Sequence, residues 1–278
     1  MLRAVLSTLT LGLLSFSFTL PADGVHADVL PSTAVKAPVI TTPVTSTMPD
    51  RLTFAEKQAA FNDHVLDIYN SADLQRKGLS FDVFQKALIG FHNFKKNNLI
   101  SPSKSVITVV DFTKSSSQKR LWTIDLHSKK VLFNTLVAHG RNTGGDKAVK
   151  FSNQPNSFMS SVGFYLTNQT YYGKHGLSLR LSGMDDKYNS NALPRAIVIH
   201  GADYVSEAFV KRNGRLGRSL GCPALPQEVS KDVINAIKDK TVLYIHGAEK
   251  NYTSNYLNPA TAVDAFALET LSSTVSKI

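Results

Sequence analysis

The sequence predicts an α+β protein, in which a β-dominated domain with mainly antiparallel sheets follows a helical N-terminal extension. Apolar residues recur at helical spacing up to about residue 96, and short β-branched and aromatic runs follow from about residue 104. The chain has 278 residues, of which 42% are hydrophobic and 19% charged, so its composition is that of a globular protein. This length provides for one sizeable core with appendages.

Two helices are expected in the extension, which we place at residues 51–100. Thr53-Phe-Ala-Glu56 has the form of a capping box, in which a hydroxyl and a carboxylate bind backbone N–H groups at a helix start. The apolar residues from Phe54 to Tyr69 form one broad face. A second helix is expected to begin at Ser80 and to run to about Lys96.

The β-rich runs at 106–112, 121–126 and 131–137 are separated by Ser- and Lys-rich turns, which predicts a meander of antiparallel strands. Further strands are expected at 163–167, 177–181, 196–200 and 241–246, with a helix at 227–238 between the last two. The β-dominated domain is therefore placed at 101–250, and residues 251–278 are set apart as a C-terminal tail.

The first 27 residues have the form of a secretory signal peptide. Arg3 precedes a short apolar run, and the small-residue pattern Val25-His26-Ala27 follows it. An uncleaved anchor is the alternative, but the run is short for a membrane span. Residues 28–50 carry four prolines and little charge, which is typical of an extended linker. We therefore expect an exported protein of the periplasm or cell envelope.

The formal net charge is +10. For an exported protein, an anionic wall polymer or a membrane surface is a more suitable electrostatic partner than nucleic acid. A basic but merely soluble surface is the alternative. The sequence carries no indication of the oligomeric state.

Cys222 is the only cysteine in the chain, so no internal disulfide can form. A lone thiol in an exported protein is buried, paired between chains or reactive. Cys222 follows Gly217-Arg218-Ser219-Leu220-Gly221 and precedes Pro223. This polar, flexible setting favours an exposed nucleophile whose neighbouring backbone N–H groups, around Gly221, form an oxyanion hole.

A thiol near its ordinary pKa is mostly protonated at neutral pH, so a nucleophilic cysteine requires a base. His200 is the candidate, because the apolar run 196–199 predicts a buried strand that ends at it, with Gly201 permitting a sharp turn. Arg218, four residues before Cys222, is expected either to lower the thiol pKa or to bind a substrate carboxylate.

His200-Gly201 followed by Ser219-Leu220-Gly221-Cys222 resembles the signature of the YkuD-type L,D-transpeptidases. The form Gly-Arg-Ser-x-Gly-Cys-Pro-Ala at 217–224 is similar to the murein L,D-transpeptidase catalytic domain branch of that family. The resemblance extends over roughly residues 70–248, including the segments 137–140, 160–165 and 172–181. Two departures stand out: Leu220 replaces the second histidine of the signature, and Pro223-Ala224 replaces the residues that usually follow the cysteine.

The resemblance implies an enzyme that forms a thioester on Cys222 with a peptidoglycan stem peptide and cross-links third-position residues. It implies His200 as general base, the Gly201 carbonyl as the group that orients the imidazole, and Gly221 in the oxyanion hole. It requires no metal or cofactor. Further candidates for substrate binding, placed in Gly-flanked or strand-edge segments, are Arg218, Ser219, His139, His175, Ser160 and Ser161.

Four other outcomes stay open. Water could resolve the same acyl-enzyme, which would make the protein an L,D-carboxypeptidase, or another polymer or protein could be the acceptor. A non-catalytic wall-binding protein would suit the positive charge but leaves Cys222 unexplained. A zinc hydrolase would need a ligand arrangement that is not indicated, because the sequence has no HxxxH or CxxC pair.

Overall fold

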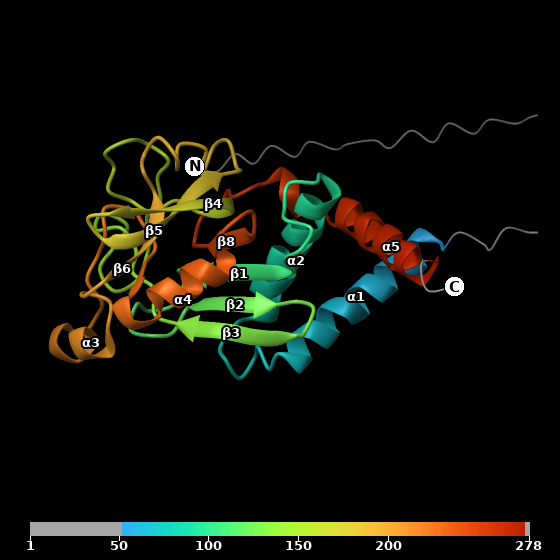
Figure 1. The fold of residues 1–278 in the computed structure, drawn as a ribbon, viewed down its shortest axis with the longest axis horizontal. Coiled ribbons are helices and arrows are strands. Elements are labelled where there is room, and N and C mark those ends of the chain that lie inside the picture. The colour runs from blue at the N-terminus through green and yellow to red at the C-terminus, as the bar shows by residue number, and fades with distance from the viewer. Residues whose placement is uncertain (1–51, 276–278) are drawn as a thin grey trace, which may run out of the picture. The chain divides into compact units, whose positions relative to one another are not determined.

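The computed structural model describes residues 52–275. The predicted signal peptide and the whole of the predicted linker lie outside these residues. An eight-stranded mixed sheet forms the centre of the fold, with helices packed against both faces (Figure 1). The fold is therefore α+β, as the sequence predicts, and none of the helices within 52–275 has the length and apolar character to cross a membrane.

The sheet has the strand order β3-β2-β1-β8-β4-β5-β6-β7. Five of its seven pairings are antiparallel; β1 with β8 and β6 with β7 are parallel. The predicted meander is confirmed, because β1, β2 and β3 pair consecutively. The strand bounds are Val106–Asp111 (β1), Leu121–Asp125 (β2), Lys130–Thr135 (β3), Gly163–Gly173 (β4), Gly176–Gly183 (β5), Val198–Ala202 (β6), Ala224–Pro226 (β7) and Val242–His246 (β8).

Helices α1 (Phe54–Ser71) and α2 (Phe81–Lys96) agree closely with the sequence prediction. The capping box is present: Glu56 N–H donates to Thr53 Oγ1 (3.3 Å), and Thr53 N–H donates to the Glu56 carboxylate (2.7 Å). Such a cap contributes about 1 kcal/mol to helix stability.

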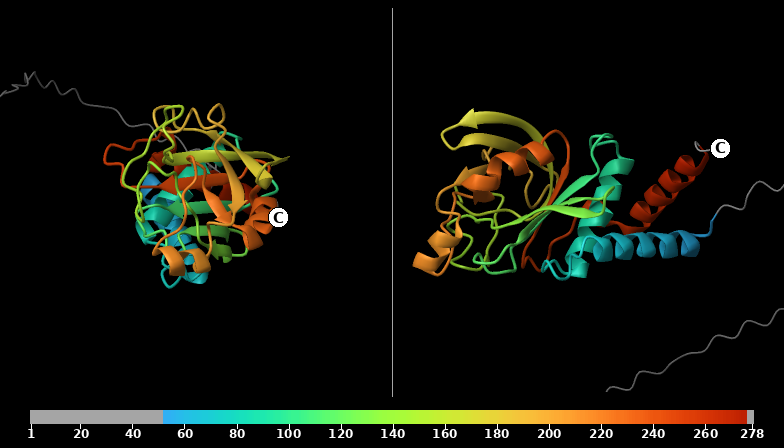
Figure 2. Two further views of the ribbon diagram at one scale, coloured as in Figure 1. Left: turned by 90° about the vertical axis from the view of Figure 1, so that its left-hand side faces the viewer. Right: turned by 60° about the horizontal axis from the view of Figure 1, so that its bottom comes forward.

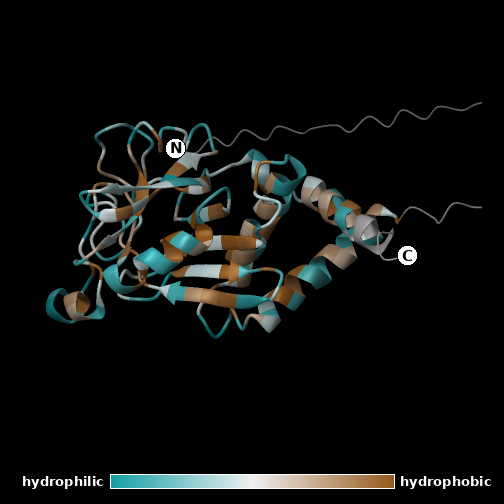
Figure 3. Ribbon diagram, in the orientation of Figure 1, coloured by the Kyte–Doolittle hydropathy of each residue, from teal (hydrophilic) through white to brown (hydrophobic). Residues whose placement is uncertain are grey.

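The two faces of the sheet bury different clusters, because successive side chains of a strand point to opposite faces. Ile107 and Val109 of β1 face α1, α2 and the C-terminal helix α5 (Pro259–Val275), whereas Val110 faces α4 (Gln227–Ile237). Figure 3 shows apolar residues running along the strands and α2, with the connecting loops mostly polar. The helical extension thus shares its core with the sheet.

Four elements were not predicted: strand β7, the short helix α3 (Glu207–Asn213), the 3₁₀ helix η1 (Asn255–Leu257) and helix α5. The segment set apart as a tail holds α5, which lies beside α2 (Figure 2). Asn93 of α2 anchors the approach to α5, because its Nδ2 donates to the carbonyls of Tyr256 (2.8 Å) and Asn258 (2.9 Å). The domain boundaries themselves remain predictions.

Candidate active site

Cys222 lies on the loop that leads into β7, next to the start of β6. The parallel register pairs His200 of β6 with Ala224 of β7, so Cys222 stands two residues ahead of that pair and beside Val198. Val198 N–H donates to Cys222 Sγ (3.5 Å), and the thiol donates to the Ala196 carbonyl (3.7 Å). The free thiol is half-buried and is held by backbone groups in the resting state.

The other side of this loop is held by the segment 137–144. Ala138 and Ala224 exchange backbone hydrogen bonds of 2.9 and 3.3 Å. Ser219 N–H donates to the His139 carbonyl (3.0 Å), and Arg141 N–H donates to the Ser219 carbonyl (2.8 Å). The Cys222 loop is therefore fixed from both sides by main-chain bonds, which preorganises the sulfur.

Two buried serines hold the turn before the sulfur. Ser219 Oγ donates to the Cys222 carbonyl (2.6 Å) and accepts a hydrogen bond from Gly221 N–H (3.1 Å). Ser160 Oγ donates to the Gly221 carbonyl (3.0 Å) and accepts one from Gly140 N–H (3.0 Å). The Gly221 N–H is therefore engaged with Ser219 in this conformation.

Gly221 has φ +129°, a conformation that favours glycine. A Cβ atom at this position would lie 2.9 Å from both the Met159 carbonyl oxygen and Ile197 Cδ1. Both the backbone angle and the lack of space therefore require glycine immediately before the cysteine.

A cavity of about 480 Å³ lies at this loop and brings together five of the residues that the sequence nominates: His175, His200, Arg218, Ser219 and Cys222. Gly201 lines an adjoining cavity of about 580 Å³ that shares His175 and Tyr204 with the first. The side chains of His139, Ser160 and Ser161 are buried and do not line the Cys222 cavity.

His200 is buried, and its ring is oriented by the backbone. Its Nδ1–H donates to the Gly201 carbonyl (2.9 Å), which leaves Nε2 as the unprotonated nitrogen of a neutral ring. Burial lowers the pKa of His200, partly opposed by the bond to Gly201. The exposed His175 ring, at the tip of the β4–β5 hairpin, stacks on His200 with a centroid separation of 4.3 Å. The imidazole is thus neutral at pH 7 and able to accept a proton.

Burial also raises the pKa of the Cys222 thiol. The Val198 N–H and the positive charge of Arg195 oppose this rise. The sequence favours Arg218 for this electrostatic role, but the Arg218 guanidinium binds the carbonyls of Arg141 (3.2 Å) and Gly144 (3.1 Å) at the cavity rim. Arg195 is the cation that acts on the thiol.

Arg195 is the main residue of the site that the sequence analysis missed. Within the described residues 52–275, its guanidinium donates only to neutral acceptors, at 2.6–3.1 Å: the carbonyls of Ser152 and Met159 and the hydroxyls of Ser157 and Ser161. The arginine therefore lies beside the thiol without a carboxylate partner. Its only sequence signal is its position in the loop ahead of a buried strand.

The buried candidates His139 and Ser161 form hydrogen bonds inside the protein, beneath the Cys222 loop. His139 Nδ1 accepts a hydrogen bond from the buried Arg120 guanidinium (2.8 Å), and burial with the Arg120 charge lowers the pKa of His139 to about 4. Ser161 Oγ accepts from Arg195 and donates to the Ser152 carbonyl. Among residues 52–275, no group of three or more His, Cys, Asp or Glu side chains is arranged to hold a metal ion.

Comparison with known protein families gives a match. A family model described as the L,D-transpeptidase catalytic domain matches residues 75–246. No curated protein compared with the chain matches it.

Similar solved structures include an L,D-transpeptidase from Mycobacterium smegmatis, with 11% identity and a TM-score of 0.33, covering 51% of this chain and 59% of that one. The helical cell shape determining protein Pgp2 from Campylobacter jejuni has 13% identity and a TM-score of 0.37, with coverage of 66% and 64%. An L,D-transpeptidase from Xylanimonas cellulosilytica has 12% identity and a TM-score of 0.29, with coverage of 67% and 91%. The chain spans about half to two thirds of the length of the first structures that it matches.

Proposed function

The chain belongs to the L,D-transpeptidase catalytic domain family, and from this membership we propose that it is a cysteine acyltransferase acting on peptidoglycan stem peptides. The observation that carries the proposal is the convergence of Cys222 and His200 on one cavity. A parallel strand pair sets His200 opposite Ala224, two residues after Cys222, and a loop bonded on both sides presents the sulfur.

In the proposed reaction, the carbonyl between the third-position diamino acid and the terminal D-Ala lies at Cys222 Sγ. His200 Nε2 takes the thiol proton as the S–C bond forms. The imidazolium then gives this proton to the departing D-Ala amine as the C–N bond breaks, which leaves a thioester. The Gly201 carbonyl keeps the imidazole in the required tautomer throughout.

The negative charge on the attacked carbonyl oxygen requires backbone donors. We assign this role to the N–H groups around Cys222. The Gly221 N–H joins them only when it leaves Ser219 Oγ, to which it donates in the resting loop. Gly221 is in any case required for the turn that presents these groups.

Arg218 and His175, exposed at the rim of the cavity, are the groups we assign to substrate recognition, with Arg218 binding a stem-peptide carboxylate. Ser219, His139, Ser160 and Ser161 form internal hydrogen bonds, so we assign them to positioning the Cys222 loop and Arg195.

The thioester is released by the side-chain amine of a second stem, which gives a cross-link between third-position residues. Release by water would instead give a tripeptide, the product of an L,D-carboxypeptidase. Export to the periplasm or cell envelope, directed by residues 1–27, would bring the enzyme to this substrate.

The test is incubation of the purified protein with a disaccharide tetrapeptide, followed by mass spectrometry of products and protein. The expected results are a cross-linked dimer and an acyl adduct on Cys222. Tripeptide alone would establish the carboxypeptidase. Full activity in Cys222→Ala would refute the mechanism, and binding without turnover in the wild-type protein would favour a wall-binding protein.

A further inference from the structure

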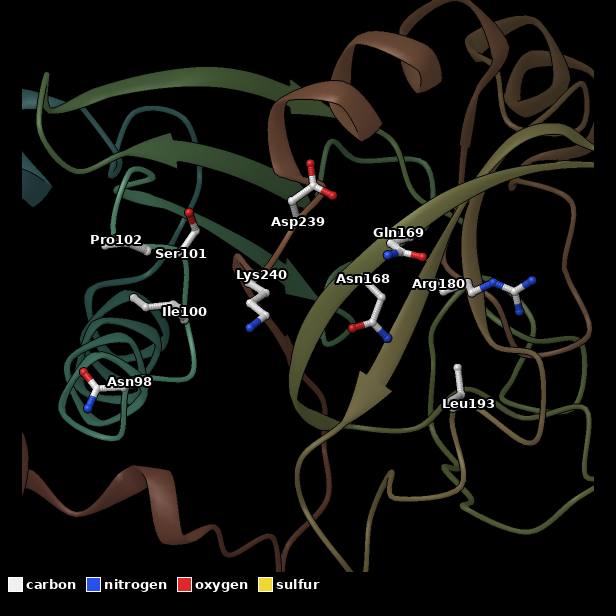
Figure 4. A pocket seen from close by; sticks show the side chains of 10 residues that line it. All are labelled: Asn98, Ile100, Ser101, Pro102, Asn168, Gln169, Arg180, Leu193, Asp239 and Lys240. Carbon is white, nitrogen blue, oxygen red and sulfur yellow. The ribbon is translucent and has the colours of Figure 1, made fainter.

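A larger cavity, of about 690 Å³, lies apart from the Cys222 cavity. Three parts of the fold line it: the α2–β1 loop, the middle of the β4–β5 pair with the loop that follows β5, and the α4–β8 turn. Figure 4 shows the loop residues on one side, the β4 and β5 residues on the other, and Lys240 between them. Its lining residues are Asn98, Ile100, Ser101, Pro102, Asn168, Gln169, Arg180, Leu193, Asp239 and Lys240.

The backbone frame of this cavity is built from strained residues held by main-chain bonds. Asn98, Asp239 and Lys240 have φ values of +54°, +64° and +64°, which non-glycine residues rarely adopt. The Lys240 carbonyl accepts from Ser101 N–H (2.9 Å), and Lys240 N–H donates to the Thr167 carbonyl (2.9 Å). Asn98 and Asp239 directly follow the C-caps of α2 and α4, where a left-handed residue commonly ends a helix, and the main-chain bonds fix these turns as walls of the cavity.

The polar face of β5 connects this cavity to the Cys222 cavity. Alternate residues of a strand share a face, so Ser178, which lines the Cys222 cavity, and Arg180, which lines the larger one, stand side by side about 7 Å apart. The Arg180 guanidinium lies 4.4 Å from the ring centroid of Tyr171, another residue of the Cys222 cavity. Arg180 also pairs with Val198, whose N–H donates to the sulfur.

The lining presents several polar groups that the protein itself does not use. Within residues 52–275, the side chains of Asn98, Gln169 and Lys240 are exposed and have no intramolecular hydrogen bond or ion pair. Beside them lies Leu193, whose side chain is an exposed apolar surface (49%). Amides, cations and small apolar surfaces suit a ligand with hydroxyl, acetamido and carboxyl groups on rings that have apolar faces.

We propose that this cavity binds the glycan strand of the polymer whose stem peptide is bound at Cys222; the inference rests on the proposed function. Three stem residues in extended form reach about 10 Å. Laid along the polar face of β5, a stem whose third residue reacts at Cys222 places its sugar near Arg180, where the larger cavity begins. The cavity recognises N-acetylated amino sugars, with Gln169 and Asn98 binding the acetamido groups and Lys240 a ring hydroxyl or carboxylate.

Binding is tested without catalysis in full-length Cys222→Ala protein, by calorimetric titration with soluble glycan chains from which the stem peptides have been removed. Gln169→Ala and Lys240→Gln, each added to this background, are expected to weaken binding about tenfold, the effect of losing one charged or well-formed hydrogen bond. Arg212→Ala, an exposed cation of α3 outside both cavities, is the matched control and should bind as the parent does. Equal affinity in all variants, or no binding of stem-free glycan by the parent, would overturn the proposal.

A second measurement uses the catalytically intact protein. The ratio of kcat/KM for a disaccharide tetrapeptide to that for the free tetrapeptide should fall about tenfold in Gln169→Ala and Lys240→Gln. An unchanged ratio would show that the cavity binds no part of the substrate. A loss of kcat/KM confined to the free tetrapeptide would show that the cavity binds peptide. A wild-type protein that turns over neither substrate but whose variants lose glycan affinity would refute the proposed reaction and retain the glycan site.

Discussion

Removing the charge of Arg195 should raise the pKa of the Cys222 thiol. Arg195→Met keeps the approximate length of the side chain and removes the charge. The positive charge of Arg195 opposes the rise in pKa that burial causes at the thiol, so its loss should raise the thiol pKa further, by an amount moderated because Arg195 is only half-buried. Arg195→Lys keeps the charge but loses the forked hydrogen bonds of the guanidinium, so the thiol pKa should rise less than in Arg195→Met.

The assay is the rate of iodoacetamide alkylation as a function of pH. Cys222 is the only cysteine, so the signal belongs to one site. At neutral pH, Arg195→Met should react on the order of tenfold more slowly, because a higher thiol pKa lowers the thiolate fraction exponentially. Arg218→Met is the matched control, since that guanidinium binds carbonyls at the cavity rim. An unchanged or lower apparent thiol pKa in a folded Arg195→Met protein would refute the assignment.

Three further outcomes are expected. Cys222→Ser should reduce kcat/KM on muropeptides by at least roughly 10³-fold with little change in Tm, and no acyl adduct should appear in the mass of the intact protein. Ser219→Ala removes the hydrogen bonds to the Cys222 carbonyl and from the Gly221 N–H. The free energy of unfolding, measured by urea denaturation, should therefore fall by about 2–4 kcal/mol. The exposed Ser71→Ala serves as its control, and an equal effect in both would contradict a special role of the loop. Burial lowers the pKa of His92 to about 3, so His92 contributes stability that is complete above pH 6.5 and is lost as the pH falls toward 3. Between pH 7.5 and pH 5, the free energy of unfolding should therefore fall by about 2 kcal/mol less in His92→Phe than in the wild-type protein.

The features of the fold that follow from local signals could be predicted from the sequence. The capping box at Thr53 and the β-rich runs of β1 to β3 are local, and the structure has them where they were expected. Helix α3 also carries local signals, since Ser206 caps its start and Gly214 ends it at φ +71°, but it is only seven residues long. Strand β7 has three residues and includes Pro226, so nothing in its sequence distinguishes it from a loop.

The site depends on contacts that sequence spacing does not encode. The approach of Cys222 to His200, which the sequence suggests from the need of the thiol for a base, arises from the parallel β6–β7 register, which the sequence does not predict. Arg195 acquires its role because residues 152–161 fold around its guanidinium, which no local pattern indicates. His139 and Ser160 resemble cleft residues in the sequence, yet their polar atoms are used inside the protein.

Burial shifts the pKa values of Cys222 and His200 in opposite directions, and both shifts favour the uncharged side chain. It raises the pKa of the thiol and lowers that of the imidazole, so the resting pair is uncharged at neutral pH. An uncharged thiol is a poor target for oxidants, which matters for a lone cysteine if the protein is exported. In the proposed reaction, the thiolate forms only as His200 takes the proton, while Arg195 and the Val198 N–H stabilise the charge on sulfur. Arg195 therefore stabilises the reacting sulfur more than the resting thiol, which is the condition for a charge to accelerate the chemical step.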